Sequence, residues 1–191
     1  EVVYAGHVGF ALGAKGFRPS LPLWALIFAS QIPDWTDATL CLSGFHSDTP
    51  GMFSHSLPAI ALLTLLATAV YFSATRDLTG TAFVAALVVS HVLGDYVTGL
   101  KPTWSGGPVI GLQLYRVPAW DFVVEAIVIL VGWLVYRTSL PRDRRSTPDA
   151  WSLLGSLSSP GSTTITRGGP WAAASSRAAR CFVRTPSWGT S

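Results

Sequence analysis

A histidine and an aspartate stand four residues apart in an apolar stretch, in the sequence SHVLGD at residues 90–95. His91 is the only ionisable side chain between Leu78 and Gly94. On a helix, this spacing places His91 and Asp95 on the same face. A carboxylate in such surroundings is costly unless a positive group pairs with it. The pair therefore suits two ligands of one metal ion, and a plain hydrogen-bonded His–Asp pair is the alternative.

Other histidines and acids extend this set. Asp121 and Glu125 repeat the four-residue spacing, which is unfavourable for two carboxylates unless one is protonated or a cation lies between them. The candidate metal ligands are His7, Asp34, His55, His91 and Asp95, with Glu125 as a further member. Zinc binds nitrogen and oxygen ligands of this kind, and manganese or iron also fits. Because a catalytic zinc uses three protein ligands, the set would serve one ion or two, with Asp95 bridging a pair of ions.

Each of these residues also has a simpler interpretation when it is taken alone. Asp34 precedes a predicted helical turn, so capping is the favoured role for this residue by itself. Capping also explains Asp121 well. His7 is equally well explained as an interfacial histidine, and His55 as a loop residue before a helix. The remaining candidates are expected to be solvated or without a role: Asp37, His46 and Asp48.

The composition indicates a membrane protein. Hydrophobic residues make up 49% of the chain and charged residues 12%, against about 25% charged residues in a typical soluble domain. Three stretches approach the ~20 residues that a spanning helix needs, at residues 58–75, 78–100 and 117–136. Shorter apolar pieces at 2–14 and 21–32 predict a helical hairpin packed against them. The expected fold is all-α: an integral membrane bundle of three spanning helices plus a short N-terminal helical hairpin.

Two parts of the chain are expected, a membrane-embedded helical domain at residues 1–137 and a disordered tail at residues 138–191. The tail lacks periodicity and is rich in Ser, Thr and Arg, so it buries too little apolar surface to offset its ordering entropy. Its seven Arg and two Asp give +5, which leaves −2 for residues 1–137 and argues against nucleic-acid binding. Residues 34–56 and 101–116 are expected to be loops. No removable signal peptide is expected.

Basic residues predict the orientation in the membrane. Lys15, Arg18, Arg76 and Arg137 would share one side with the tail, and this side is cytoplasmic by the positive-inside tendency. Lys101 and Arg116 would lie on the other side. The segment lengths then bring five residues toward the non-cytoplasmic face: His7, Asp34, His55, Asp95 and Asp121.

Four short motifs occur in a recognisable order: GH at 6–7, IPD at 32–34, FSHS at 53–56 and SHVLGD at 90–95. This order resembles the predicted membrane-bound metal-dependent hydrolases, which are similar in motif order to the bacterial zinc-dependent phospholipases C. The segments DYVT at 95–98 and GLQLY at 111–115 resemble an uncharacterised branch of that family. The resemblance covers residues 4–137 and implies a bacterial or archaeal plasma membrane.

The resemblance implies that His7, Asp34, His55, His91 and Asp95 are the metal ligands, with Asp95 as the bridge. Two departures stand out. The second acid that relatives carry after the first is Asp37 here, one position late, and Pro50-Gly51 replaces a His-Arg pair before His55. Lys101 or Arg116 would then have to hold an anionic substrate.

Two hypotheses of different classes follow. In the preferred one, the protein is a membrane hydrolase that uses a divalent metal, with Asp34 or Glu125 as the catalytic base and a phosphoester or lipid-like molecule as substrate. In the alternative, it is a non-catalytic multi-pass membrane protein whose histidines and carboxylates form a structural or cation-binding cluster. A transporter is disfavoured because the chain is short and has no internal repeat.

Overall fold

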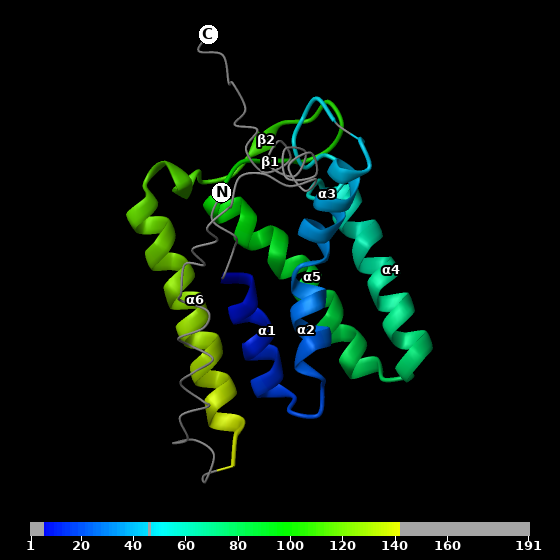
Figure 1. The fold of residues 1–191 in the computed structure, drawn as a ribbon, viewed down its shortest axis with the longest axis vertical. Helices are drawn as coiled ribbons and strands as arrows, with labels where there is room; N and C mark the ends of the chain where they lie inside the picture. The colour runs from blue at the N-terminus through cyan, green and yellow to red at the C-terminus, as the bar shows by residue number, and fades with distance from the viewer. Residues whose placement is uncertain (1–5, 46, 142–191) are drawn as a thin grey trace, which may run out of the picture.

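Three long apolar helices form the frame of the protein, as seen in a computed structural model that describes residues 6–45 and 47–141 (Figure 1). They are α4 (Leu57–Thr75), α5 (Leu78–Thr98) and α6 (Pro118–Ser139). With 19, 21 and 22 residues, each is long enough to cross a bilayer at about 1.5 Å of rise per residue. The predicted three-helix, all-α membrane fold is confirmed.

The central helix is α5. The apolar windows of α4 and α6 are only 6% and 17% buried, whereas that of α5 is 39% buried. Helix α4 packs on α5 and leaves most of its surface open, as lipid-facing helices do.

The predicted N-terminal hairpin consists of α1 (Gly6–Phe17) and α2 (Leu23–Ser30), which lie between α6 and α4 in Figure 1. Helices α1, α2 and α5 share a core in which Ala11, Leu26 and Leu87 are buried. This packing fixes both ends of the hairpin relative to α5. The start of α1 and the end of α2 are thereby held beside the polar part of α5.

Glycines allow α1 to lie close along α6. A Cβ on Gly9 would lie 2.6 Å from the Val128 carbonyl oxygen, and one on Gly16 would lie equally close to that of Val135. Small residues permit such contact between helix backbones. Because Gly9 meets Val128 and Gly16 meets Val135, the two helices run in the same direction.

The segment at 34–56 is not entirely a loop, so that prediction is wrong for its first part. Helix α3 occupies Ile32–Leu42 and has Pro33 in its first turn, a position that suits proline because the backbone nitrogen needs no partner there. Asp34 also lies in the first turn, where a negative charge is favourable. The polar residues of this segment are therefore compatible with a helix. Gly44, with φ of 83°, lies just beyond the end of α3.

The segment at 101–116 is a loop with short regular pieces. Two-residue strands β1 (Lys101–Pro102) and β2 (Val109–Ile110) pair antiparallel, and a 3-10 turn, η1 (Leu114–Arg116), leads into α6. The backbone nitrogen of Leu57 donates to Thr103 O at 2.9 Å, which ties this hairpin to the start of α4. The hairpin therefore covers the end of the bundle at which α5 finishes (Figure 1).

Basic residues gather at the opposite end. Arg18, just after α1, pairs with Asp77 in the α4–α5 turn, with 3.1 Å between Nη2 and Oδ1. Arg76 is the neighbour of Asp77, and Arg137 lies in the last turn of α6, which runs alongside α1. The predicted tail starts at residue 138, but α6 continues to Ser139 and residues 142–191 lie outside the described part of the chain.

Candidate metal centre

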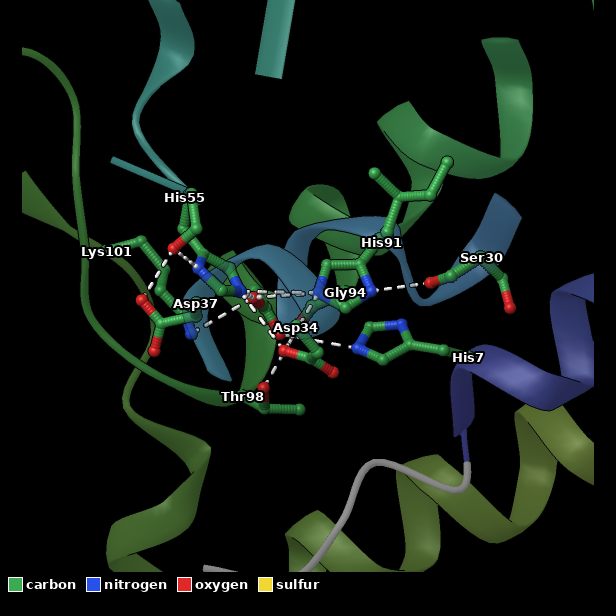
Figure 2. Close-up of polar contacts among 12 residues, drawn as sticks. His7, Ser30, Asp34, Asp37, His55, His91, Gly94, Thr98 and Lys101 are labelled. Carbon is green, nitrogen blue, oxygen red and sulfur yellow. Dashed lines mark hydrogen bonds and ion pairs between the residues drawn. The ribbon is translucent and has the colours of Figure 1, made fainter. Parts of the chain in front are cut away.

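Four segments bring the candidate ligands to one place inside the bundle, shown in Figure 2. His7 is in the first turn of α1, Asp34 in the first turn of α3, and His55 two residues before α4. His91 and Asp95 project from α5, and neither is exposed at all. The structure therefore brings together the five residues that the sequence selects as metal ligands.

His91 and Asp95 lie on one face of α5, as their spacing predicts. His91 Nε2 is 3.5 Å from Asp95 Oδ2. In this position Asp95 is surrounded by three histidines rather than by apolar side chains alone, because His7 and His55 also approach its oxygens.

His55, His91 and Asp34 form a triangle of ligand-type atoms. The Nε2 atoms of His55 and His91 are 3.4 Å apart, and Asp34 Oδ1 lies 3.3 Å from the former and 3.5 Å from the latter. Two ligands at about 2.0–2.1 Å from a tetrahedral zinc ion are separated by about 3.4 Å. The triangle therefore has the dimensions of one face of a zinc coordination tetrahedron. We call it the Asp34 triangle below.

His7 approaches Asp95 from the other side. Its Nε2 atom is 3.4 Å from Asp95 Oδ1, and its ring stacks on the ring of His91 with 3.8 Å between centroids. A Cβ on Gly94 would lie 3.1 Å from His7 Cε1, so the glycine leaves room for this ring. His7, His91 and Asp95 thus form a second group in which ligand atoms lie within 4.8 Å of one another.

The carboxylate of Asp95 faces both groups. Its Oδ1 atom is directed to His7, whereas Oδ2 lies 3.1 Å from His55 Nε2. The two oxygens of Asp95 thus face different histidines.

The ring of His91 is oriented by the end of α2. His91 Nδ1 lies 2.7 Å from the carbonyl oxygen of Ser30, the last residue of that helix. A carbonyl only accepts hydrogen bonds, so Nδ1 carries a hydrogen, and Nε2 is the ring nitrogen that faces the centre. A backbone carbonyl on the second nitrogen is a usual partner of a metal-binding histidine. Ser30 gave no signal in the sequence.

A lysine reaches the same carboxylate. Lys101, on β1, lies with Nζ 3.0 Å from Asp95 Oδ2 and has 18% of its side chain exposed. The sequence analysis assigns Lys101 an anionic substrate as a possible partner, whereas the structure pairs it with Asp95. Its ammonium group stabilises the buried carboxylate without any metal, so a charge cluster accounts for part of this geometry.

Protons compete for the Asp34 triangle. Burial favours the neutral acid at Asp34, but hydrogen bonds with His55 and His91 outweigh it and lower the pKa of Asp34. Burial also opposes a charge on His55, yet its bonds with Asp34 and Asp95 outweigh this effect and raise the pKa of His55. Beside the ammonium group of Lys101, further positive charge near the two carboxylates can come from a proton on His55 or from a bound cation.

The structure corrects two simpler interpretations. Asp34 does not cap a helix, because the N-cap of α3 is Gln31 and Asp34 points to the two histidines. Asp37 is exposed but not merely solvated, because it accepts a hydrogen bond from Ser54. His46 lies outside the described residues.

Glu125 and Asp121 lie on α6, to one side of the centre. Among the described residues, Glu125 belongs to neither three-residue group. Together with His7, it lines a small cavity of about 40 Å³ between α1, α5 and α6. Asp121 is buried in the first turn of α6, and its N-cap is Val117. The catalytic role predicted for Glu125 stays a prediction.

Comparison with known proteins identifies a family. A model of the family described as YdjM inner membrane protein matches residues 3–144. No curated protein and no solved structure matches the chain. The matched region contains the three long apolar helices and all five residues of the candidate centre, and the description of the family names a location but no activity. The chain is therefore an integral membrane protein, and it belongs to the YdjM inner membrane protein family.

Proposed function

We propose that the protein is a membrane-embedded, metal-dependent hydrolase with its ion at the Asp34 triangle. The observation that carries this proposal is the set of three separations, 3.3, 3.4 and 3.5 Å, between ligand atoms from α3, α5 and the segment before α4. Ordinary ion pairing needs no such equal spacing. Tetrahedral zinc coordination does require nearly equal distances between its ligand atoms. Two imidazoles and a carboxylate are also a set of donors that catalytic zinc uses.

The donors favour one tightly held ion and leave a second optional. His91 belongs to both three-residue groups, but its Nδ1 atom is engaged by Ser30, so only Nε2 is available. One ion at the Asp34 triangle takes that atom. A second ion would depend on His7 and on Asp95 Oδ1, the oxygen that faces His7, and Asp95 would bridge the two ions. Manganese and iron accept the same donors as zinc.

Asp34 marks the open side of the centre. Its side chain is 38% exposed, whereas those of His7, His55, His91 and Asp95 are at most 4% exposed. A bound divalent ion supplies Lewis acidity, which lowers the pKa of water toward neutrality. Because only Oδ1 of Asp34 belongs to the triangle, the other carboxylate oxygen would orient an incoming water and accept its proton. Glu125, across the small cavity from His7, is the other candidate for this role.

A lipid-like phosphoester is the substrate class that the position of the centre favours. His55 precedes α4 and Asp95 lies in the last turn of α5, so the centre is near one end of the membrane helices, at the depth of lipid headgroups. The basic residues Arg18 and Arg137 are at the other end, which the positive-inside tendency assigns to the cytoplasm. The centre would then face the non-cytoplasmic side.

The second candidate function is a non-catalytic membrane protein with a structural charge cluster. The contact of 3.0 Å between Lys101 and Asp95 favours it, since a lysine is already present where a metal would supply charge. In that case the cluster would hold α1, α3 and α5 together, and its residues would matter for stability alone.

Metal analysis of the protein purified in detergent without chelators tests the proposal. We expect about one zinc equivalent for the wild type and loss of the metal in Asp34→Ala and His91→Ala. Asp77→Asn, which removes a carboxylate at the opposite end of the bundle, is the matched control and should retain the metal. Zinc-dependent release of phosphate-bearing headgroups from mixed micelles would support hydrolysis. Trace metal that is the same in the wild type and in His91→Ala would refute the proposal.

A further inference from the structure

The side chain of Ser54 lies between those of Asp37 and His55, and His55 is one of the histidines of the candidate centre. The Ser54 hydroxyl oxygen is 2.8 Å from Asp37 Oδ1 and 2.7 Å from His55 Nδ1. Ser54 is fully buried, and His55 is 3% exposed. The three side chains therefore form one short hydrogen-bonded chain from α3 to the centre. Figure 2 shows two of its members, Asp37 and His55.

The direction of these hydrogen bonds follows from the groups involved. An ionised carboxylate only accepts, so the single hydrogen of Ser54 goes to Asp37. The Ser54 oxygen then accepts from His55 Nδ1–H. In the neutral ring this leaves the lone pair on Nε2, the atom that faces His91, Asp34 and Asp95.

Like the carbonyl of Ser30 at His91, this hydrogen-bonded chain engages the Nδ1 atom of a histidine ring, but it is built from side chains. His91 is held by the fixed carbonyl of Ser30, whereas His55 is held by two side chains. Asp37 is exposed, so its charge stays hydrated and costs little to place there.

The backbone around Ser54 is also fixed. The amide nitrogens of Ser54 and His55 both donate to the carbonyl oxygen of Gly51, at 3.2 and 2.7 Å. Gly51 has φ of 75°, a conformation that favours glycine, and the Ser56 side chain caps α4 by accepting from Ala59 N. These backbone contacts hold Ser54 in place next to His55.

We propose that Asp37 and Ser54 are positioning residues that orient His55 for metal binding. The proposal deepens the metal-dependent function above and rests on it. Neither residue touches the ion or the substrate. Their effect is transmitted through the hydrogen on His55 Nδ1, which fixes the ring and leaves Nε2 for the ion. Partners of this kind change metal affinity by about 10–100-fold when they are removed.

Zinc affinity in a double-mutant cycle tests the proposal. Ser54→Ala and Asp37→Ala should each weaken zinc binding by at least about tenfold. The double variant should be hardly weaker than Ser54→Ala alone, because both changes break the same chain. Asp37→Asn keeps an acceptor oxygen and should bind zinc more tightly than Asp37→Ala. Asp48→Ala, in the loop that follows α3, is the control for loss of an exposed acid.

Different results separate this proposal from the one before it. If the wild type binds zinc and all variants bind it equally well, the positioning role is refuted and the metal site stands. Additive losses would also refute a common chain. If the wild type binds no zinc, the metal-dependent function fails and the positioning role fails with it. Non-additive changes in the Tm of the metal-free protein would then show that the hydrogen-bonded chain serves stability only.

Discussion

The Nε2 atoms of His55 and His91 face each other across 3.4 Å, while the Nδ1 atom of each ring is anchored to other parts of the protein. Both neutral rings would then direct lone pairs at one another and at two carboxylates. Such an arrangement is unfavourable unless something positive occupies the space. A proton on His55, the ammonium of Lys101 and a metal ion are the three sources of that charge.

The first prediction concerns pH. The pKa of His55 is raised, so its proton is bound over a wider range and competes with the metal. Zinc affinity should therefore fall as pH falls below the His55 pKa, by about tenfold per pH unit for one displaced proton, and level off above it. The lowered pKa of Asp34 keeps that carboxylate ionised throughout. Competition titrations with a chelator between pH 5.5 and 8.5, roughly the range in which histidines titrate, measure this. A flat profile would contradict it.

The same pKa shifts predict the opposite trend for the metal-free protein. A raised folded-state pKa means that the His55 contribution to the free energy of unfolding is present below its unfolded pKa and is lost as pH rises through the folded pKa. Without metal, the Tm should therefore decrease over this interval, and added zinc should restore it. The control is His55→Gln, whose Tm should lack this step.

The second prediction separates the lysine from the metal. Lys101→Met removes the ammonium 3.0 Å from Asp95 and leaves a buried carboxylate with less compensation. Loss of one partner of a buried pair costs about 3–5 kcal/mol, an upper limit here because Lys101 is partly exposed. We expect a lower Tm without metal and recovery on zinc addition. A drop in Tm that zinc does not reverse would favour the purely structural cluster.

Much of this fold can be predicted from the sequence because the strongest signals are local. Three uncharged or nearly uncharged runs of about 20 residues give the membrane helices directly. The i, i+4 spacing of His91 and Asp95 fixes their common face once α5 is a helix. The sequence does not reveal helix α3, because its polar residues are also typical of a loop and the helix is held by contacts with α4 and α5.

The supporting groups of the centre could not be predicted in the same way. The Ser30 carbonyl acts through the backbone, so its residue type carries no information. Asp37 and Ser54 are 17 residues apart and meet only because α3 folds back on the start of α4. Lys101 reaches Asp95 through a two-residue strand pair that no periodicity reveals.

The third prediction tests how α1 is held on α6. Gly9→Ala should lower the Tm in detergent, because its Cβ would lie within 2.6 Å of the Val128 carbonyl oxygen. Gly13→Ala is the matched control on the same helix, since its Cβ would lie 3.9 Å from Gly132 Cα. It should be neutral or stabilising, as alanine is favoured over glycine in a helix by about 1 kcal/mol. Equal effects of the two changes would mean that α1 does not pack on α6 in this register. Displacement of α1 would also move His7, so zinc affinity offers a second measurement.

The fourth prediction addresses Asp34, where catalysis and structure diverge most clearly. Asp34→Asn keeps the size and one oxygen of the side chain but removes its charge and its ability to accept a proton from water. Since this side chain is 38% exposed, the fold should survive, with a Tm close to that of the wild type. Turnover of a phosphoester lipid should fall by at least about a hundredfold, the scale of general acid–base catalysis, even at saturating zinc. Asp48→Asn, in an exposed loop position, should leave turnover unchanged.

If Asp34→Asn instead unfolds the protein and no lipid or soluble phosphoester is hydrolysed by the wild type, the carboxylate serves the charge cluster alone. Glu125→Gln, measured in parallel, identifies the base: loss of turnover in Glu125→Gln with retention in Asp34→Asn would move that role across the cavity to α6.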